Sequence, residues 1–187
     1  IEAYTVQLHQ PITDALALKG ISMIAENLEK AYENGEDREA RRNMMIASTI
    51  GGMAFISSNV GAVHAFAETV GAWFDTPHGV ANSLFLPYIM EFNIPACPER
   101  FADIADAMGI EREESMSDEQ YALKAVEYVK ALNRKLNIPT IKEIKGITEE
   151  RFEAIAERSA NNVLSNDNAR KITKEDYLEL LKKAYNE

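Results

Sequence analysis

The chain has 187 residues, 46% of them hydrophobic, and a formal net charge of −10, so it is long enough to bury the core of one large or two small domains. The negative charge argues against a nucleic-acid partner, because binding a phosphate backbone needs a basic face. There is no uninterrupted apolar run of about 18 residues, which argues against a membrane span. The single cysteine, Cys97, rules out an internal disulfide and fits a reducing, cytoplasmic compartment.

Apolar residues recur at helical spacing along the chain and almost never alternate with a period of two, which predicts successive helices. Thr13 or Asp14 can cap the first helix, and Gly35 ends it. The second helix begins near Asp37 with charged residues and then becomes apolar on most faces. The pair Gly51-Gly52 lies in this apolar half, and we interpret its small residues as a surface for tight helix packing.

The turn Asp75-Thr76-Pro77 separates the third helix from the fourth, in which Pro87 predicts a kink or a break. Ser117 to Gln120 resembles a capping box, and Thr173 caps the last helix. No repeat or Ser/Gly linker occurs, so we expect an all-α, multi-helix bundle that forms one domain over residues 1–187. The helices expected in chain order cover residues 13–35, 37–56, 60–74, 78–92, 98–109, 121–136, 148–160 and 177–185.

Several common functional motifs are missing. The chain contains no GxGxxG loop after a strand and no GxxxxGK[ST], so it carries no recognised loop for a dinucleotide or a triphosphate. It also lacks the GxSxG motif of a serine nucleophile. The N-terminal sequence IEAYTVQLHQ has neither a Met nor a signal-peptide pattern, and we expect the chain to be part of a longer polypeptide.

The most informative stretch covers residues 61–93 and holds His64 and His78, two of the three histidines. Both lie among apolar and small residues, and a neutral imidazole is the commonest metal ligand. The turn after the third helix predicts that the two helices fold back on each other. His78 would then lie at a helix N-terminus, where the helix dipole disfavours a protonated ring. We expect the third histidine, His9, to be a surface residue.

Glu68 lies four residues after His64 and therefore on the same helix face. Its spacing alone is compatible with a metal ligand, a partner of a ligand, a proton acceptor or a surface carboxylate. A divalent metal usually takes three or four protein ligands, so His64 and His78 are too few. Either Glu68 completes the site or the missing ligands lie outside this chain.

The same stretch resembles the signature of the iron-containing (group III) alcohol dehydrogenases, and the spacing agrees throughout. The matching segments are His64–Gly71, Pro77–Asn82, Leu86-Pro87 and Phe92-Asn93. Three further segments are similar to family motifs: Ile1–Tyr4 to the end of HA[IL]EAY, Pro11–Leu18 to PxTDALAL, and Asn168–Asp176 to NPRxxTxED. The resemblance covers essentially the whole chain as the family's C-terminal helical domain, which has a dehydroquinate synthase-like fold.

This resemblance implies that His64 and His78 are two of four ligands to Fe²⁺ or Zn²⁺. The other two would belong to a DAxxHA segment whose His lies two residues before Ile1. It also implies reversible hydride transfer between a small alcohol or aldehyde and NAD or NADP, with the metal as Lewis acid. The cofactor would bind through an N-terminal nucleotide-binding domain that this chain lacks.

Three positions depart from the family pattern. Family members often carry a His where this chain has Glu68, and that His is a candidate proton relay, so a catalytic role of Glu68 is not carried over directly. Leu164 stands where the family often has a Cys, and Ala169 replaces the Pro of the NPR motif. Substrate preference therefore cannot be copied from any one relative.

Three functions remain open from the sequence. The leading one is the metal- and substrate-binding domain of an alcohol dehydrogenase. The isolated chain would then have little or no activity, and it could form homo-oligomers. The second is a non-catalytic helical module for oligomerisation or scaffolding. The third is a self-sufficient metalloprotein that uses His64, Glu68 and His78. Phe66, Phe74 and Phe85 are equally well interpreted as pocket walls or as core residues.

Overall fold

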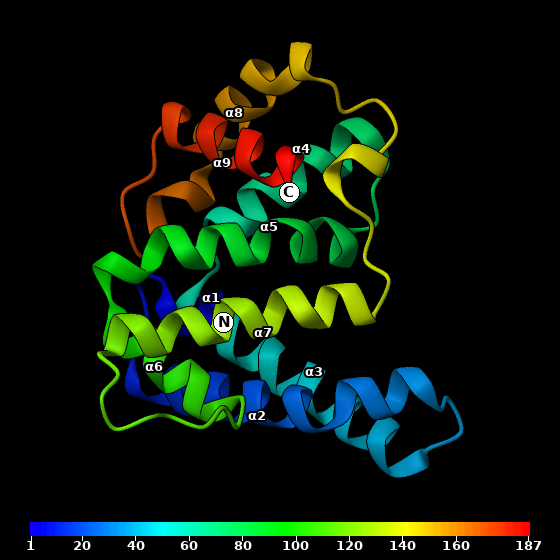
Figure 1. Ribbon diagram of the computed structural model, residues 1–187, viewed down its shortest axis with the longest axis vertical. Coiled ribbons are helices and arrows are strands. Elements are labelled where there is room, and N and C mark those ends of the chain that lie inside the picture. The colour runs from blue at the N-terminus through cyan, green and yellow to red at the C-terminus, as the bar shows by residue number, and fades with distance from the viewer. The chain divides into compact units, whose positions relative to one another are not determined.

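The computed structural model describes residues 1–187, and every regular element in it is a helix (Figure 1). The predicted all-α fold is therefore confirmed. Four short 3₁₀ helices cover Ile94–Ala96, Ile141–Glu143, Glu149–Arg151 and Val163–Asp167. The α-helices are α1 (Glu2–Thr5), α2 (Pro11–Glu33), α3 (Arg38–Ser58), α4 (Ala62–Phe74), α5 (His78–Asn93), α6 (Pro98–Ala107), α7 (Asp118–Lys135), α8 (Phe152–Ala160) and α9 (Lys174–Asn186).

The chain divides into two compact units, each built from two separate segments. The first unit comprises residues 1–59 and 94–125, and the second comprises residues 60–93 and 126–187. Because the chain passes from one unit to the other three times, no single linker separates them in the sequence. The expectation of one domain over residues 1–187 stays a prediction.

In the first unit, α2 and α3 lie side by side (Figure 1). A methyl group placed on Gly20 would lie 3.6 Å from Cγ2 of Ile50 and 3.9 Å from the carbonyl oxygen of Ala47. By contrast, a methyl group on Gly51 or Gly52 would meet no atom within 4 Å. The tight packing predicted for α3 is thus present, but the glycine at the contact belongs to α2.

The start of α2 corrects one prediction. The N-cap is Gln10 rather than Thr13 or Asp14, and its side chain accepts a hydrogen bond from Ile12 N at 3.2 Å. Thr13 is the reciprocal partner, since its Oγ1 accepts from Gln10 N at 3.1 Å. Pro11 occupies the first helical position, where a missing N–H leaves no intrahelical bond unmade.

Helix α1 is held against its neighbours by Arg100 of α6. The Arg100 guanidinium lies 3.8 Å from the ring centroid of Tyr4, and it donates to Tyr4 O and to Asp14 Oδ1, each at 2.8 Å. The Tyr4 hydroxyl donates to Asp103 at 2.5 Å, and burial together with this bond raises the pKa of the phenol. His9 is exposed, as expected, with Nδ1 3.3 Å from Asp14.

Cys97 should react slowly with thiol reagents. Burial raises the pKa of this thiol from 9.0 to about 11, so the thiolate fraction at pH 8 should be roughly 100-fold below that of an ordinary cysteine. Labelling with Ellman's reagent should speed up about tenfold per pH unit until the pKa is reached. The same measurement in denaturant supplies the unburied control, and equal rates in both conditions would contradict the buried position.

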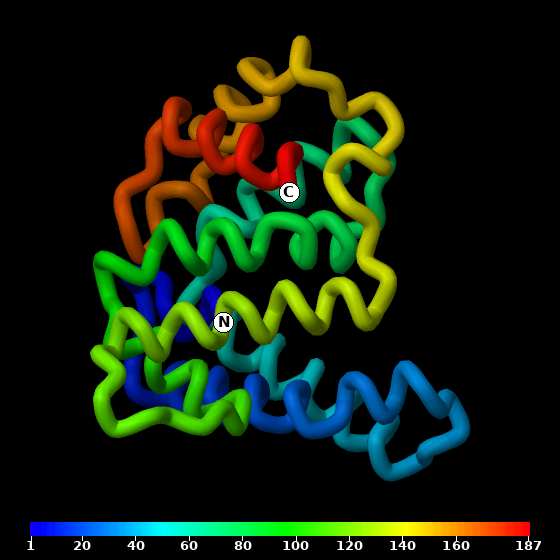
Figure 2. Tube along the Cα trace, viewed as in Figure 1, coloured from blue at the N-terminus to red at the C-terminus, as the bar shows by residue number.

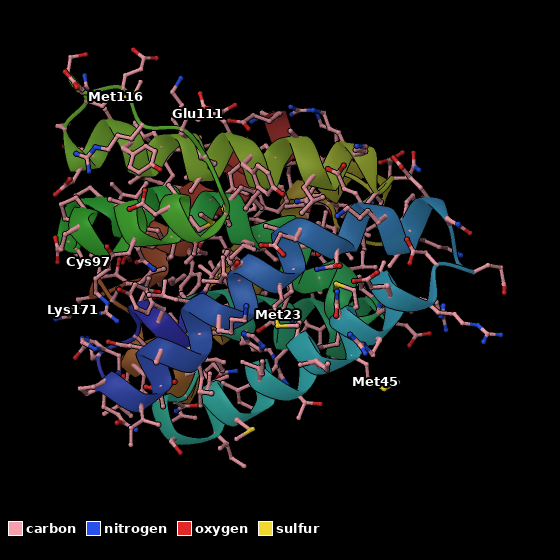
Figure 3. The ribbon with its side chains drawn as sticks, turned by 90° about the horizontal axis from the view of Figure 1, so that it is seen from below. Met23, Met45, Cys97, Glu111, Met116 and Lys171 are labelled. Atoms are coloured by element: carbon pink, nitrogen blue, oxygen red, sulfur yellow. The ribbon has the colours of Figure 1, made fainter.

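Helix α3 exposes several large apolar side chains. Ile56 and Met45 are 81% and 74% exposed, and Figure 3 shows Met45 on the outer side of the α2–α3 pair. Ile46, Met53 and Phe55 are also more than a third exposed. No single helix is long and apolar enough to cross a membrane. Helices α3 and α4 meet the length and composition criteria only when they are taken together across the bend between them.

The second unit packs α5 beside α4 and α9, and α8 beside α4 and α9 (Figure 2). Phe66 and Phe85 are 0% exposed and stack with ring centroids 4.1 Å apart. Tyr177 meets Phe66 edge-on at 4.7 Å. Phe66 and Phe85 are therefore core residues, while Phe74 is half-buried and packs against this core.

Helix α5 runs through Pro87 without a break, contrary to one of the two alternatives predicted for it. A proline has no N–H for the carbonyl four residues earlier, which here belongs to Ser83. The side chain of Asn133 on α7 donates to that carbonyl at 2.7 Å. A side chain distant in sequence therefore replaces the hydrogen bond that proline removes.

Candidate metal centre

The two predicted histidines meet at the turn between α4 and α5. His64 is the third residue of α4 and His78 is the first residue of α5, and these helices pack together. The ring centroids lie 5.2 Å apart with the planes tilted by 54°. His64 is half-buried and His78 is exposed. The predicted fold-back of the two helices is confirmed, and it brings the two imidazoles into contact.

A compact turn makes this approach possible. Asp75 ends α4 in the left-handed conformation, with φ of 51°, which short acidic side chains tolerate better than most. The chain then returns over α4, so that a methyl group on Gly71 would lie 3.3 Å from the carbonyl oxygen of Thr76. The absence of a side chain on Gly71 lets the segment before α5 lie close to the helix that carries His64.

Asn82 contacts His78 directly from the next turn of α5. Its Nδ2 lies 3.0 Å from His78 Nε2 and 2.9 Å from the carbonyl oxygen of His78. That carbonyl can only accept, so it requires the NH₂ side of the amide, and Nε2 then accepts the second N–H. Asn82 Oδ1 is left buried without a hydrogen-bond partner. The amide therefore takes up the Nε2 lone pair of His78, so a metal ion could bind at Nε2 only by replacing this hydrogen bond.

Glu68 is exposed and is held by another residue. Its Oε2 accepts a hydrogen bond from Asn162 Nδ2 at 2.7 Å, across 94 positions of sequence. No group of three or more His, Cys, Asp or Glu side chains is arranged to hold a metal ion. His64 and His78 thus form a two-histidine set, and imidazole is a ligand type that suits iron or zinc. The donor set fits part of a metal shell.

Two residues that contact the candidate site residues, Asn82 at His78 and Asn162 at Glu68, were not assigned a role from the sequence. Asn82 could have been found, because it lies four residues after His78 and hence on the same helix face. Asn162 could not, because its bond to Glu68 depends on how the segment after α8 packs. The fold and site together define an all-helical chain that presents two imidazoles from adjacent helices.

The chain matches the model of a known protein family. The model of the Fe-containing alcohol dehydrogenase family, C-terminal, matches residues 1–185. The chain belongs to the Fe-containing alcohol dehydrogenase family, as its C-terminal, all-helical region. The resemblance found in the motifs around His64 and His78 is thereby confirmed at the level of the family.

Individual relatives agree with this assignment. Alcohol dehydrogenase 4 of Saccharomyces cerevisiae is 40% identical, a match that covers 99% of this chain and 47% of that protein. NADPH-dependent butanol dehydrogenase of Clostridium saccharobutylicum is 37% identical, with 99% and 47% covered. A solved alcohol dehydrogenase from Oenococcus oeni superposes with a TM-score of 0.94 at 39% identity, covering 98% of this chain and 48% of that chain. The chain spans about half the length of the curated relatives it matches.

Proposed function

We propose that this chain is the metal- and substrate-binding part of an oxidoreductase that transfers hydride reversibly between a small alcohol or aldehyde and NAD or NADP. One observation carries the proposal: in a chain of this family, His64 and His78 lie with ring centroids 5.2 Å apart at one helix turn. The names of the yeast and Clostridium relatives support the alcohol substrate class and a nicotinamide cofactor.

In this proposal His64 and His78 hold one Fe²⁺ or Zn²⁺ ion together with ligands from another part of the protein. A two-histidine set needs further ligands, because such ions usually take three or four from the protein. The family resemblance suggests their source, a DAxxHA segment that would precede Ile1. When bound, the ion would polarise the alcohol oxygen and lower its pKa.

The side chains of this domain prepare the ligands. Asn82 holds the ring of His78 in place through its contact with Nε2, and a metal ion bound at that nitrogen would take the place of this hydrogen bond. Half-burial limits the approach of water to His64. Glu68 lies on the His64 face of α4 but is bound to Asn162, so we assign it no ligand role and leave its proton-transfer role as an expectation from the sequence.

The nicotinamide cofactor is expected to bind through a separate N-terminal nucleotide-binding domain, because no phosphate-binding loop occurs in this sequence. A reducing compartment such as the cytoplasm would suit the single buried thiol of Cys97. Homo-oligomers are compatible with the apolar side chains that α3 exposes.

The alternative of a non-catalytic oligomerisation or scaffold module rests on those same exposed side chains of α3. It leaves the contact between His64 and His78 without a purpose. The enzyme proposal accounts for this contact with one site.

Metal analysis and turnover of the full-length protein test the proposed function. The protein should contain iron or zinc and should oxidise small alcohols with NAD or NADP after metal loading. The 187-residue chain alone should turn over little or no substrate. Robust turnover by this chain alone would contradict a site shared with another domain, and full-length protein without metal affinity would contradict the site itself.

Replacing Glu68 with Gln should leave metal affinity within about threefold of wild type. The amide oxygen of Gln can still accept the hydrogen bond from Asn162, while the charge that a ligand would supply is lost. Competition with a chromophoric chelator measures the affinity, and Glu153→Gln, an exposed carboxylate of α8, is the matched control. A strong loss at Glu68 alone would favour the self-sufficient metalloprotein built from His64, Glu68 and His78.

A further inference from the structure

Two buried asparagines of the second unit bind each other. Asn93 and Asn168 are 3% and 1% exposed. Asn93 Nδ2 donates to Asn168 Oδ1 at 3.0 Å, and Asn168 Nδ2 donates to Asn93 Oδ1 at 2.7 Å. Burying a side-chain amide is unfavourable unless its hydrogen bonds are made. The two reciprocal bonds therefore stabilise this pair in its buried position.

The pair also contacts backbone at the start of the helix that carries His64. Asn168 Oδ1 accepts a hydrogen bond from Ala62 N at 3.3 Å. Ala62 is the first residue of α4, and the N-cap, Gly61, has no side chain to satisfy the N–H groups of the first turn. Asn168 therefore supplies, from 106 positions away, an acceptor that a capping side chain would normally provide.

The same cluster holds the end of the helix that begins with His78. Asn93 is the last residue of α5. Just before it, the carbonyl of Phe92 accepts from Arg170 Nη1 at 3.0 Å, and the Arg170 guanidinium lies 4.2 Å from the ring centroid of Phe92. Asn168 Nδ2 in turn donates to the carbonyl of Arg170 at 2.8 Å. One cluster thus joins the first turn of α4, the last turn of α5 and residues 168–170.

We propose that Asn93 and Asn168 are positioning residues that set the His64 imidazole against His78. The inference rests on the proposed metal site and extends it to residues that touch neither histidine. His64 lies two residues after Ala62, inside the turn that Asn168 holds. Loss of the Asn168 acceptor frees that turn to shift, and a shift of the imidazole removes it from the geometry that a metal ion requires.

The test measures Co²⁺ affinity of the full-length protein by competition with a chromophoric chelator. Asn168→Ala removes the bonds to both Ala62 and Asn93, and it should weaken Co²⁺ binding by about 10- to 100-fold. Asn93→Ala leaves the Asn168–Ala62 bond in place, so its loss of affinity should be smaller. Circular dichroism establishes that each variant is folded at the temperature of the measurement.

Tyr177→Phe is the matched control for a purely structural role. It removes the buried bond of 2.6 Å between the Tyr177 hydroxyl and Ser165 in the same unit, without touching the first turn of α4. Its Co²⁺ affinity should stay within about twofold of wild type. If the asparagine variants lose thermal stability but bind Co²⁺ as Tyr177→Phe does, the positioning role is overturned.

Two further arms separate the possible failures. In a His64→Ala background, Asn168→Ala should cause no additional loss of affinity, because the residue through which it acts is gone. An additional loss of full size would overturn the inference. If Asn168→Ala does not fold, the comparison of Asn93→Ala with Tyr177→Phe decides it. Wild-type protein that binds no Co²⁺ would instead refute the proposed function.

Discussion

Replacing His64 or His78 with Ala in the full-length protein should weaken metal binding by more than about 100-fold and reduce alcohol oxidation to background. Changing a residue that merely supports a ligand already costs about 10- to 100-fold in affinity, so loss of a ligand itself should cost more. The two rings lie 5.2 Å apart, and no third His, Cys, Asp or Glu is grouped with them to substitute for either.

His9→Ala is the matched control for this experiment. His9 is exposed, lies in the first unit and pairs with Asp14 at 3.3 Å. Its loss should leave metal affinity unchanged within about twofold. Metal content and chelator competition read out all three variants. Normal metal affinity in both His64→Ala and His78→Ala would eliminate the proposed site, whatever their effect on turnover.

Replacing Phe66 with Ala should lower the free energy of unfolding by about 3–5 kcal/mol. The side chain is 0% exposed, stacks on Phe85 at 4.1 Å and meets Tyr177 edge-on at 4.7 Å. Removing the ring leaves a cavity at the centre of the second unit, which the surrounding helices can only partly close. The midpoint and slope of urea unfolding measure the change.

Phe55→Ala supplies the same chemical change at the surface. Phe55 is 49% exposed on α3, so its loss should change stability by less than about 0.5 kcal/mol. A loss of less than about 1 kcal/mol at Phe66 would contradict the expected role of this ring in the core.

Helix ends were predictable where the signal is local. Thr173 caps α9 through Asp176 N at 3.2 Å, and the Ser117–Gln120 capping box before α7 has both reciprocal bonds. The start of α2 was predicted wrongly, because the N-cap is Gln10 and Thr13 is its partner in the capping box. Here the local capping rules found Thr13, which takes part in the capping box, but missed Gln10, the N-cap itself.

The candidate site divides in the same way. The residues His64 and His78 were predictable, because both belong to one continuous stretch whose spacing matches the family. The hydrogen bond that holds Glu68 was not predictable, because its donor, Asn162, lies 94 positions away. Asn93 and Asn168 belong to two separate motifs, and nothing in the sequence indicates that the two side chains bind each other 75 positions apart.

The sequence alone thus determined the all-helical class and the family, and it singled out the histidine pair as the candidate site. These depend on periodicity, capping residues and motif spacing, all of which are properties of neighbouring residues. Only the tertiary structure decided that Phe66 and Phe85 are core and that Asn133 replaces the bond lost at Pro87. Those outcomes depend on contacts between distant segments. The packing of the helices decides which side chains surround a buried ring and which donor reaches an unpaired carbonyl.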